Sequence, residues 1–260
     1  MKAFDPDRFR NQWRERVPTL GLPLRYQAVT ASTNDDALLA ARAGAPHGSL
    51  FVADEQTNGR GRRGNAWLAA PGESLLFSLL VRPELELART SALTLAIGLS
   101  LSDAITPVLN GDSPQIKWPN DLYVNGKKLA GVLVESQLQG ERLLAVVVGV
   151  GLNVSTREFP PEIAERATSL AMLGASQLER EALLYAALNA IAQRLSEYQR
   201  TGVAGILDEL NAADALRDKR IRIDEHVGVG RGLDDQGRLL LEDDAGTVHA
   251  LISGTVELLS

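Results

Sequence analysis

The sequence predicts an α+β fold with a mixed, mostly antiparallel sheet, followed by a small all-β module. Short runs of strand-forming residues bounded by Gly, Pro and Asp recur between residues 49 and 154. Residues 93–105 instead carry apolar side chains at helical spacing. From Lys219 onward only short strand-like runs split by Gly and Asp remain, which is typical of an SH3-like β-barrel.

A chain of 260 residues is long enough for one sizeable domain and one small one. The change of character near residue 215 sets the expected boundary. We therefore expect a larger domain over residues 1–214 and a small barrel over residues 215–260.

The N-terminal part is expected to alternate helices and strands. A charged, helical lead-in runs up to about Leu24, and Ser32 or Thr33 is expected to cap a short helix that ends near Gly44. Strands are expected at residues 49–54, 74–81 and 115–118.

Residues 122–135 predict a β-hairpin, because Asn125 and Gly126 supply the two positive-φ positions of a type I′ turn. The apolar run that begins at Leu143 is expected to pair with it.

A long helix follows, expected to open with a capping box formed by Ser176 and Glu179 and to reach about Gly202. In the tail, short strands are expected in the segments IRI, VGVGRGL, RLLLE, VHALI and VELL.

Composition argues against several classes of function. A net charge of −6 disfavours a broad basic face for nucleic acid, so we expect no DNA partner. The first residues lack an apolar leader, and the run at residues 143–154 is too short to cross a bilayer, so we expect a cytoplasmic protein without a membrane partner. The sequence contains no cysteine, and its three histidines lack ligand spacing, so no zinc site is expected.

The stretch GRGRRG, residues 59–64, is called the glycine-arginine loop below. Its G-x-G-x-x-G pattern follows a predicted strand, but Pro71 and Gly72 break any helix after it, which argues against a dinucleotide-binding fold. Glycines let the backbone approach a ligand, and arginines suit carboxylates and phosphates. On this loop alone, a ligand site and a solvated turn remain equally open.

A second cluster favours the ligand site. Lys117, Asn120, Asp121 and Lys128 fall within two predicted strands, where lysines are costly unless they face a ligand. Downstream, GVGLNV adds two glycines and the amide of Asn153.

Together these segments resemble the biotin protein ligases. The resemblance rests on STN (32–34), DEQTNGRGRRGNAW (54–67), KWPND (117–121), GKKLAG (126–131) and GVGLN (149–153), in the family's order and at similar spacings. It extends to the GxxxDxxGxLLLE pattern at residues 232–242. It implies a catalytic domain similar to that of lipoate ligases, followed by an SH3-like domain.

The chain also departs from the family pattern. Asn65 stands where the family usually has a basic residue, and Asn58 replaces a common Ala. Because STN begins at residue 32, we expect the form of the family that lacks an N-terminal DNA-binding domain.

The resemblance implies a two-step reaction with ATP and biotin as substrates and Mg²⁺ as the accompanying ion. Biotin is activated to biotinyl-5′-AMP, and the biotinyl group then passes to a lysine of the biotin carboxyl carrier protein of acetyl-CoA carboxylase. The alternative on the same fold is a lipoate or octanoate ligase or transferase. A homodimer is left open.

The resemblance also assigns roles to residues. Lys128 and Arg62 are the catalytic candidates. The biotin candidates are Ser32, Thr33, Asn34, Gln56, Gly59, Arg60, Arg62, Lys128, Gly131, Gly149 and Gly151. The ATP candidates are Arg62, Trp67, Lys117, Asn120, Lys128 and Asn153, and Asp121 is the candidate for Mg²⁺ bound through ATP.

Two expectations concern the glycine-arginine loop itself. Arg63 is expected to face solvent or a partner subunit. Because like charges repel and glycines are flexible, we expect the loop to be mobile in the free protein and to become ordered around its ligand.

Overall fold

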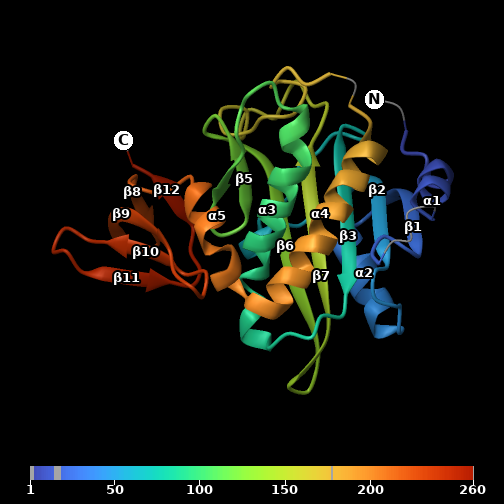
Figure 1. Ribbon diagram of the computed structural model, residues 1–260. Coiled ribbons are helices and arrows are strands. Elements are labelled where there is room, and N and C mark those ends of the chain that lie inside the picture. Colours follow the sequence, from blue (N-terminus) through green and yellow to red (C-terminus); the bar gives the residue numbers. More distant parts are fainter. Residues whose placement is uncertain (1–2, 15–18, 177, 260) are drawn as a thin grey trace.

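The computed structural model describes residues 3–14, 19–176 and 178–259. A seven-stranded sheet with its helices forms the larger N-terminal part, and a five-stranded sheet forms a smaller C-terminal part beside it (Figure 1).

The helices and strands have the following bounds. The helices are α1 (Pro6–Arg14), α2 (Thr33–Arg42), α3 (Leu93–Ile105), α4 (Arg180–Thr201) and α5 (Leu207–Ala212). The strands of the larger sheet are β1 (Leu24–Thr30), β2 (Leu50–Gln56), β3 (Ser74–Val81), β4 (Gln115–Lys117), β5 (Asp121–Val124), β6 (Lys127–Gln139) and β7 (Arg142–Asn153). Those of the smaller sheet are β8 (Arg220–Ile223), β9 (His226–Leu233), β10 (Leu239–Glu242), β11 (Val248–Leu251) and β12 (Val256–Leu258).

The larger sheet has the order β1-β2-β3-β7-β6-β5-β4. Only the β1–β2 pair is parallel; the other described pairs of this sheet are antiparallel. The prediction of an α+β fold with a mostly antiparallel sheet is therefore confirmed.

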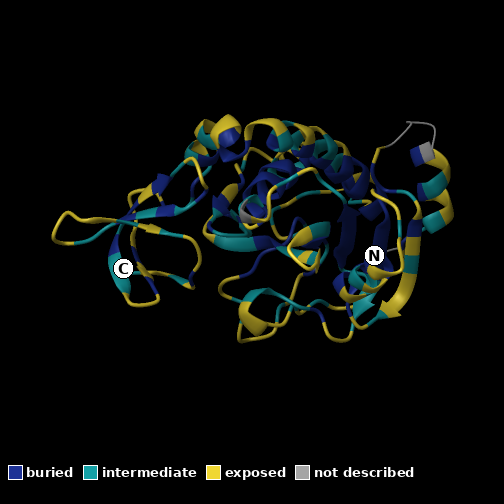
Figure 2. Cartoon of the chain, turned by 90° about the horizontal axis from the view of Figure 1, so that it is seen from below, coloured by how far each residue is buried: buried dark blue, intermediate teal, exposed yellow. Residues whose placement is uncertain are grey.

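Helices cover the two faces of this sheet unequally. Because side chains alternate along a strand, Val146 and Val148 join the main core, to which α3 and α4 contribute, whereas Ala145 and Val147 pack against α2. Figure 2 shows the buried layer between the sheet and the helices. On the α2 face of β7 the alternation continues with Gly149, which lies against Asn34 at the start of α2, and Gly151, which lies against Trp67.

The hairpin between β5 and β6 forms as predicted. Asn125 and Gly126 both have positive φ, 52° and 76°, as a type I′ turn requires. A bulge follows in β6, where Leu122 pairs with Ala130 but Tyr123 pairs with Lys128. The extra residue shifts the alternation of the strand.

The structure differs from the sequence predictions at two places. The edge strand β1 was not predicted. The predicted capping box is wrong, because α4 begins at Arg180, with Glu179 at the N-cap making no side-chain capping bond. The Arg180 side chain is buried and lies 2.7 Å from Asp54 Oδ1, so a tertiary ion pair accompanies the start of this helix.

The C-terminal strands pair antiparallel in the order β11-β10-β9-β8-β12 and appear where the sequence predicted them. The described strand pairs form an open sheet, with β11 and β12 at its edges. Buried Trp118, just after β4, donates from Nε1 to the Gly237 carbonyl at 3.0 Å. The smaller sheet is thus attached directly to the edge of the larger one.

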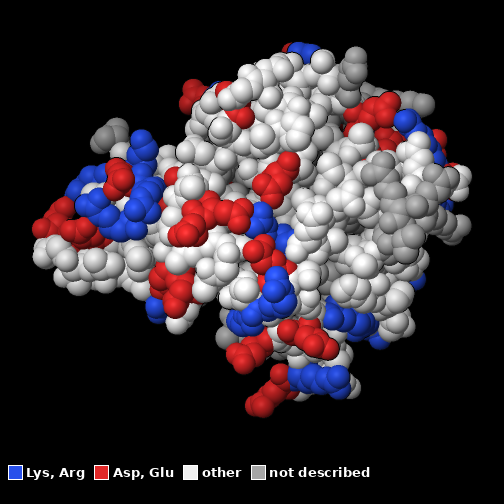
Figure 3. Space-filling model, viewed as in Figure 1, with Lys and Arg blue, Asp and Glu red and all other residues white. Residues whose placement is uncertain are grey.

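Within the described residues, no helix combines the length and apolar character needed to cross a membrane. On the face shown in Figure 3, acidic and basic side chains are interspersed.

Candidate functional site

A cavity of about 410 Å³ lies on the α2 face of the larger sheet. Every predicted site residue except Gly59 lines it. A side chain at Gly59 would instead meet the Trp67 carbonyl oxygen, with a Cβ 2.7 Å away. Gly59 therefore allows the loop to pack closely on the segment that carries Trp67.

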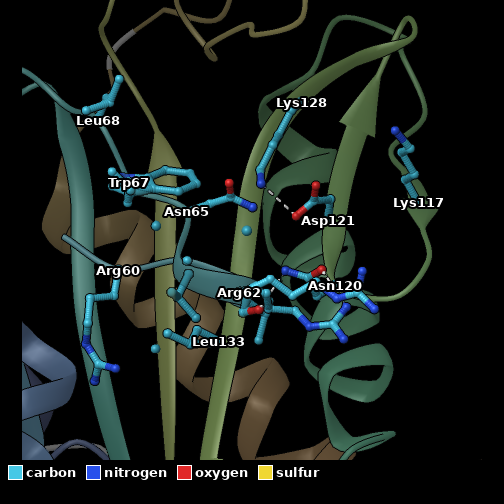
Figure 4. A pocket seen from close by; sticks show the side chains of 18 of the residues that line it. Arg60, Arg62, Asn65, Trp67, Leu68, Lys117, Asn120, Asp121, Lys128 and Leu133 are labelled. Atoms are coloured by element: carbon cyan, nitrogen blue, oxygen red, sulfur yellow. Dashed lines mark hydrogen bonds and ion pairs between the residues drawn. The ribbon is translucent and has the colours of Figure 1, made fainter. Parts of the chain in front are cut away.

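Lys128 extends into the cavity beside Asp121 (Figure 4). Its Nζ lies 2.7 Å from Asp121 Oδ1 and 5.5 Å from the centre of the Trp67 ring. The bulge in β6 accounts for this orientation, because it brings Lys128 opposite Tyr123 and places Leu129 in the core. The Lys128 ammonium is thus presented to the cavity between a carboxylate and an aromatic ring.

A polar network forms one end of the cavity. Gln56 Oε1 accepts hydrogen bonds from the Thr33 amide at 2.8 Å and from Thr33 Oγ1 at 3.0 Å. Ser78 Oγ bonds to both Thr33 Oγ1 and Asn34 Oδ1. Ser32, at the N-cap of α2, is also buried here but makes no side-chain capping bond. These groups suit a neutral ligand with both donors and acceptors.

The glycines of β7 admit protein side chains against the sheet. A Cβ on Gly149 would lie 2.1 Å from Asn34 Oδ1, and one on Gly151 would lie 2.4 Å from the Trp67 ring. A Cβ on Gly131 would lie 3.1 Å from the same ring. Asn34 and Trp67 therefore occupy the space that the glycines provide.

Arg60 is held by two carboxylates. Its guanidinium bonds to Glu135 at 2.8 and 3.0 Å and to Asp35 at 2.7 Å. Although burial works against the charged form, Glu135 and Asp35 together raise the pKa of Arg60. Glu135 also accepts a hydrogen bond from Asn34 Nδ2 at 2.7 Å, so it joins the start of α2 to the glycine-arginine loop.

The other two arginines have separate acceptors. Arg62 Nη1 lies 3.4 Å from Asn120 Oδ1. Burial and the positive charge of neighbouring Arg63 lower the pKa of Arg62. The Arg63 guanidinium binds Asp224 of the C-terminal sheet. As expected, Arg63 is exposed to solvent, with 44% of its side chain accessible, but it also pairs within the chain, which was not predicted.

A basic group forms the other end of the cavity. Lys117 Nζ lies 3.3 Å from Tyr123 Oη, and Arg166 lines the wall nearby. Burial, together with the charges of Lys128 and Arg166, lowers the pKa of Lys117. Burial and the Asp121 carboxylate raise the pKa of Tyr123 to about 12. The Asp121 carboxylate opposes the lowering of the Lys117 pKa. A bound anion could further offset the positive charge of Lys117, Lys128 and Arg166.

Asn153 is buried where β7 ends. Its Nδ2 donates to the Thr168 carbonyl at 3.0 Å, and the backbone of Lys128 bonds to Arg166 and Thr168 on the same segment. The amide therefore helps to hold the 159–168 wall of the cavity, and its predicted role in binding ATP stays a prediction.

Some lining residues, and two groups that support them, were not predicted. They are Tyr123, Phe159, Ile163, Arg166 and Gly254–Val256 in the wall, with Ser78 and Glu135 behind it. Only Glu135 carried a local signal, as the charged end of the VLVE segment.

The described residues contain no cluster of three or more His, Cys, Asp or Glu side chains suited to hold a metal ion. Asp121 is a single carboxylate on the cavity wall. Mg²⁺ is commonly held by one or two carboxylates together with substrate phosphates, so this residue fits an ion that arrives with a nucleotide.

This combination of fold and site defines the class of biotin and lipoate ligases. Residues 26–153 match the model of the biotin/lipoate A/B protein ligase family, and residues 220–259 match the biotin protein ligase C-terminal domain.

Relatives narrow the class further. The Bacillus subtilis bifunctional ligase/repressor BirA is 34% identical over 94% of this chain and 76% of its own length. The Mycobacterium tuberculosis biotin–[acetyl-CoA-carboxylase] ligase is 33% identical over 89% of this chain and 87% of its own. The solved biotin protein ligase of Aquifex aeolicus in complex with biotin and ATP superposes with a TM-score of 0.79 at 30% identity, covering 91% of this chain and 98% of that one. The chain belongs to the biotin protein ligase family.

Proposed function

We propose that the protein activates biotin with ATP and transfers it to a lysine of the biotin carboxyl carrier protein of acetyl-CoA carboxylase. The observation that carries the proposal is the position of Lys128, which lies in one cavity with the polar Thr33–Gln56 network and with the basic Lys117–Arg166 group.

In the first step a carboxylate oxygen of biotin attacks the α-phosphorus of ATP, and pyrophosphate leaves with the electrons of the broken P–O bond. Both reactants are anions, so the enzyme must bring them together and stabilise the charge of the transition state. Lys128 and Arg62 supply this positive charge. Asn120, Trp67, Lys117 and Asn153 bind the nucleotide, and Asp121 accompanies Mg²⁺.

In the second step the neutral amine of the carrier lysine attacks the acyl carbon of biotinyl-5′-AMP. AMP leaves, and the amide nitrogen loses its extra proton. We propose that the reaction takes place in the cytoplasm; the absence of cysteine is compatible with such a reducing compartment.

The polar network favours biotin over lipoate. An alkyl or dithiolane tail would leave Thr33, Asn34 and Gln56 without ligand partners, whereas the ureido ring of biotin offers both donors and acceptors.

The test is ATP–pyrophosphate exchange by the purified protein with Mg²⁺, followed by transfer of biotin to a purified carrier domain on an avidin blot. Biotin is expected to drive both reactions. Faster exchange with lipoate than with biotin would assign the site to the other branch of the class.

A further inference from the structure

The glycine-arginine loop is tied to the C-terminal sheet by one bidentate contact. Arg63 Nη1 lies 3.0 Å from Asp224 Oδ1, and Nη2 lies 3.1 Å from Oδ2. Nη1 also donates to Thr255 Oγ1 at 3.1 Å. Asp224 lies in the turn between β8 and β9, and Thr255 lies just before β12. A planar arginine fork that meets both carboxylate oxygens fixes direction as well as distance.

The backbone at both ends of this contact is in the left-handed region. Arg63 has φ 54° and Asp224 has φ 51°. Residues other than Gly seldom adopt this region, and the cost must be met by surrounding contacts. For Arg63, side-chain contacts that offset this cost come from Asp224 and Thr255 of the C-terminal domain.

The contact also bears on the cavity. Arg62 and Arg63 are consecutive in one tight turn, which is closed by a hydrogen bond from the Asn65 amide to the Arg62 carbonyl at 3.1 Å. Residues 254–256 line the cavity together with both arginines. The group that fixes Arg63 therefore also constrains the backbone that carries Arg62.

We propose that Asp224 is a positioning residue: by holding Arg63, it makes the C-terminal domain part of the active site and sets the loop in which Arg62 meets the substrates. The substrates named here rest on the proposed function. The ordering of the loop by Asp224 does not depend on them.

The test compares Asp224→Asn with Asp244→Asn. Asp244 forms a similar exposed bidentate pair with Arg220, at 2.9 and 2.9 Å, within the C-terminal sheet and away from the cavity. Deuterium uptake by residues 59–67 is measured in the ligand-free proteins, and the biotin dependence of ATP–pyrophosphate exchange is measured in parallel.

Asp224→Asn is expected to speed deuterium uptake in residues 59–67 and to raise the KM for biotin about 3- to 5-fold, the size that one exposed ion pair contributes. Asp244→Asn should change neither. Exchanging the charges, with Arg63→Asp and Asp224→Arg together, should recover much of what each single change loses.

Equal deuterium uptake in residues 59–67 of Asp224→Asn and Asp244→Asn would overturn the proposal. So would a double variant, Arg63→Asp with Asp224→Arg, that recovers nothing of what Arg63→Asp or Asp224→Arg loses alone. A wild-type protein that gives no biotin-dependent exchange, while Asp224→Asn still loosens the loop, would refute the proposed function and leave the positioning role of Asp224 standing.

Discussion

Lys128 Nζ lies 2.7 Å from Asp121 Oδ1, across the β5–β6 pair. The candidate catalytic cation is therefore paired with a carboxylate of the chain itself. A carboxylate or phosphate that binds Lys128 must compete with Asp121 or share the lysine with it. Asp121, the residue that would hold Mg²⁺ bound through ATP, is thus also the partner of Lys128, which links the two roles proposed for these residues.

Lys128→Ala is expected to abolish adenylate formation and leave the fold intact. Loss of one electrostatic donor to the transition state costs about 3–4 kcal/mol, on the order of a hundredfold to a thousandfold in rate. Pyrophosphate exchange measures the loss, and circular dichroism checks the fold. Lys127→Ala is the matched control, because its side chain is not part of the cavity wall. Comparable losses in both variants would mean that the wrong lysine had been assigned.

Glu135→Ala is expected to weaken biotin binding although Glu135 does not line the cavity. The change removes the nearer of the two acceptors of Asn34 Nδ2, at 2.7 Å against 3.5 Å for the Leu133 carbonyl, and two of the three bonds to the Arg60 guanidinium. Hydrogen bonds to charged groups contribute about 1.5–3 kcal/mol, so the KM for biotin should rise by about tenfold or more. Glu141→Ala, in the exposed β6–β7 turn, provides the control. An unchanged KM would show that Arg60 and Asn34 do not depend on this carboxylate.

Gly149→Ala is expected to displace Asn34, because the new Cβ would lie 2.1 Å from Asn34 Oδ1. Overpacking of this kind costs about 1–3 kcal/mol, and the distortion falls on the proposed biotin pocket. Isothermal titration with biotin should therefore show weaker binding. Gly98→Ala, whose Cβ would meet only the flexible end of Ile116, should bind biotin as the wild type does. Wild-type binding by Gly149→Ala would contradict the role given to Asn34.

The sequence predicted most elements of the fold because local signals agreed with the tertiary structure. Asn125 and Gly126 fix their turn by backbone conformation alone, and α3 has the predicted bounds. The edge strand β1 was missed because its side chains are mostly exposed and so lack a clear alternation of apolar and polar residues. The start of α4 was misplaced because Arg180 pairs with Asp54, which lies far away in the sequence.

The site was predicted unevenly for a similar reason. Motif residues such as Lys128 and Gln56 were found because they occur in short characteristic segments. Arg166 and Thr255 reach the cavity from segments without such a motif, and only the fold brings them there. The partner of Arg63 could not be found locally, since Asp224 is separated from it by 161 positions.

Lys117 should make stability depend on pH. Burial lowers its folded-state pKa below the ordinary 10.5, so between these two values the unfolded chain binds more protons and stability rises with pH. At neutral pH the buried ammonium is therefore a penalty.

Lys117→Met should remove that penalty, raising the Tm near neutral pH while weakening ATP binding. The gain in Tm over wild type should shrink as the pH approaches 10.5, and thermal unfolding at several pH values measures it. Lys127→Met serves as the control. A gain in Tm that is constant with pH would assign the effect to packing instead of charge.

The glycine-arginine loop is expected to change its susceptibility to trypsin when both substrates bind. Arg60, Arg62 and Arg63 are each paired with a different part of the chain, and the side chains of Arg60 and Arg63 are 33% and 44% exposed. Three separate contacts on a glycine-rich backbone still leave room for local opening, so trypsin should cut after these arginines in the free protein.

Biotin with ATP should protect the three arginines, because a ligand that bridges the loop to the cavity opposes opening. ATP alone should protect much less if biotin must fill its pocket before the loop closes. Mass spectrometry of the fragments measures the cleavage. Protection by ATP alone equal to that by both ligands would contradict this order of binding. A loop that resists trypsin without any ligand would mean that the glycines serve a fixed turn.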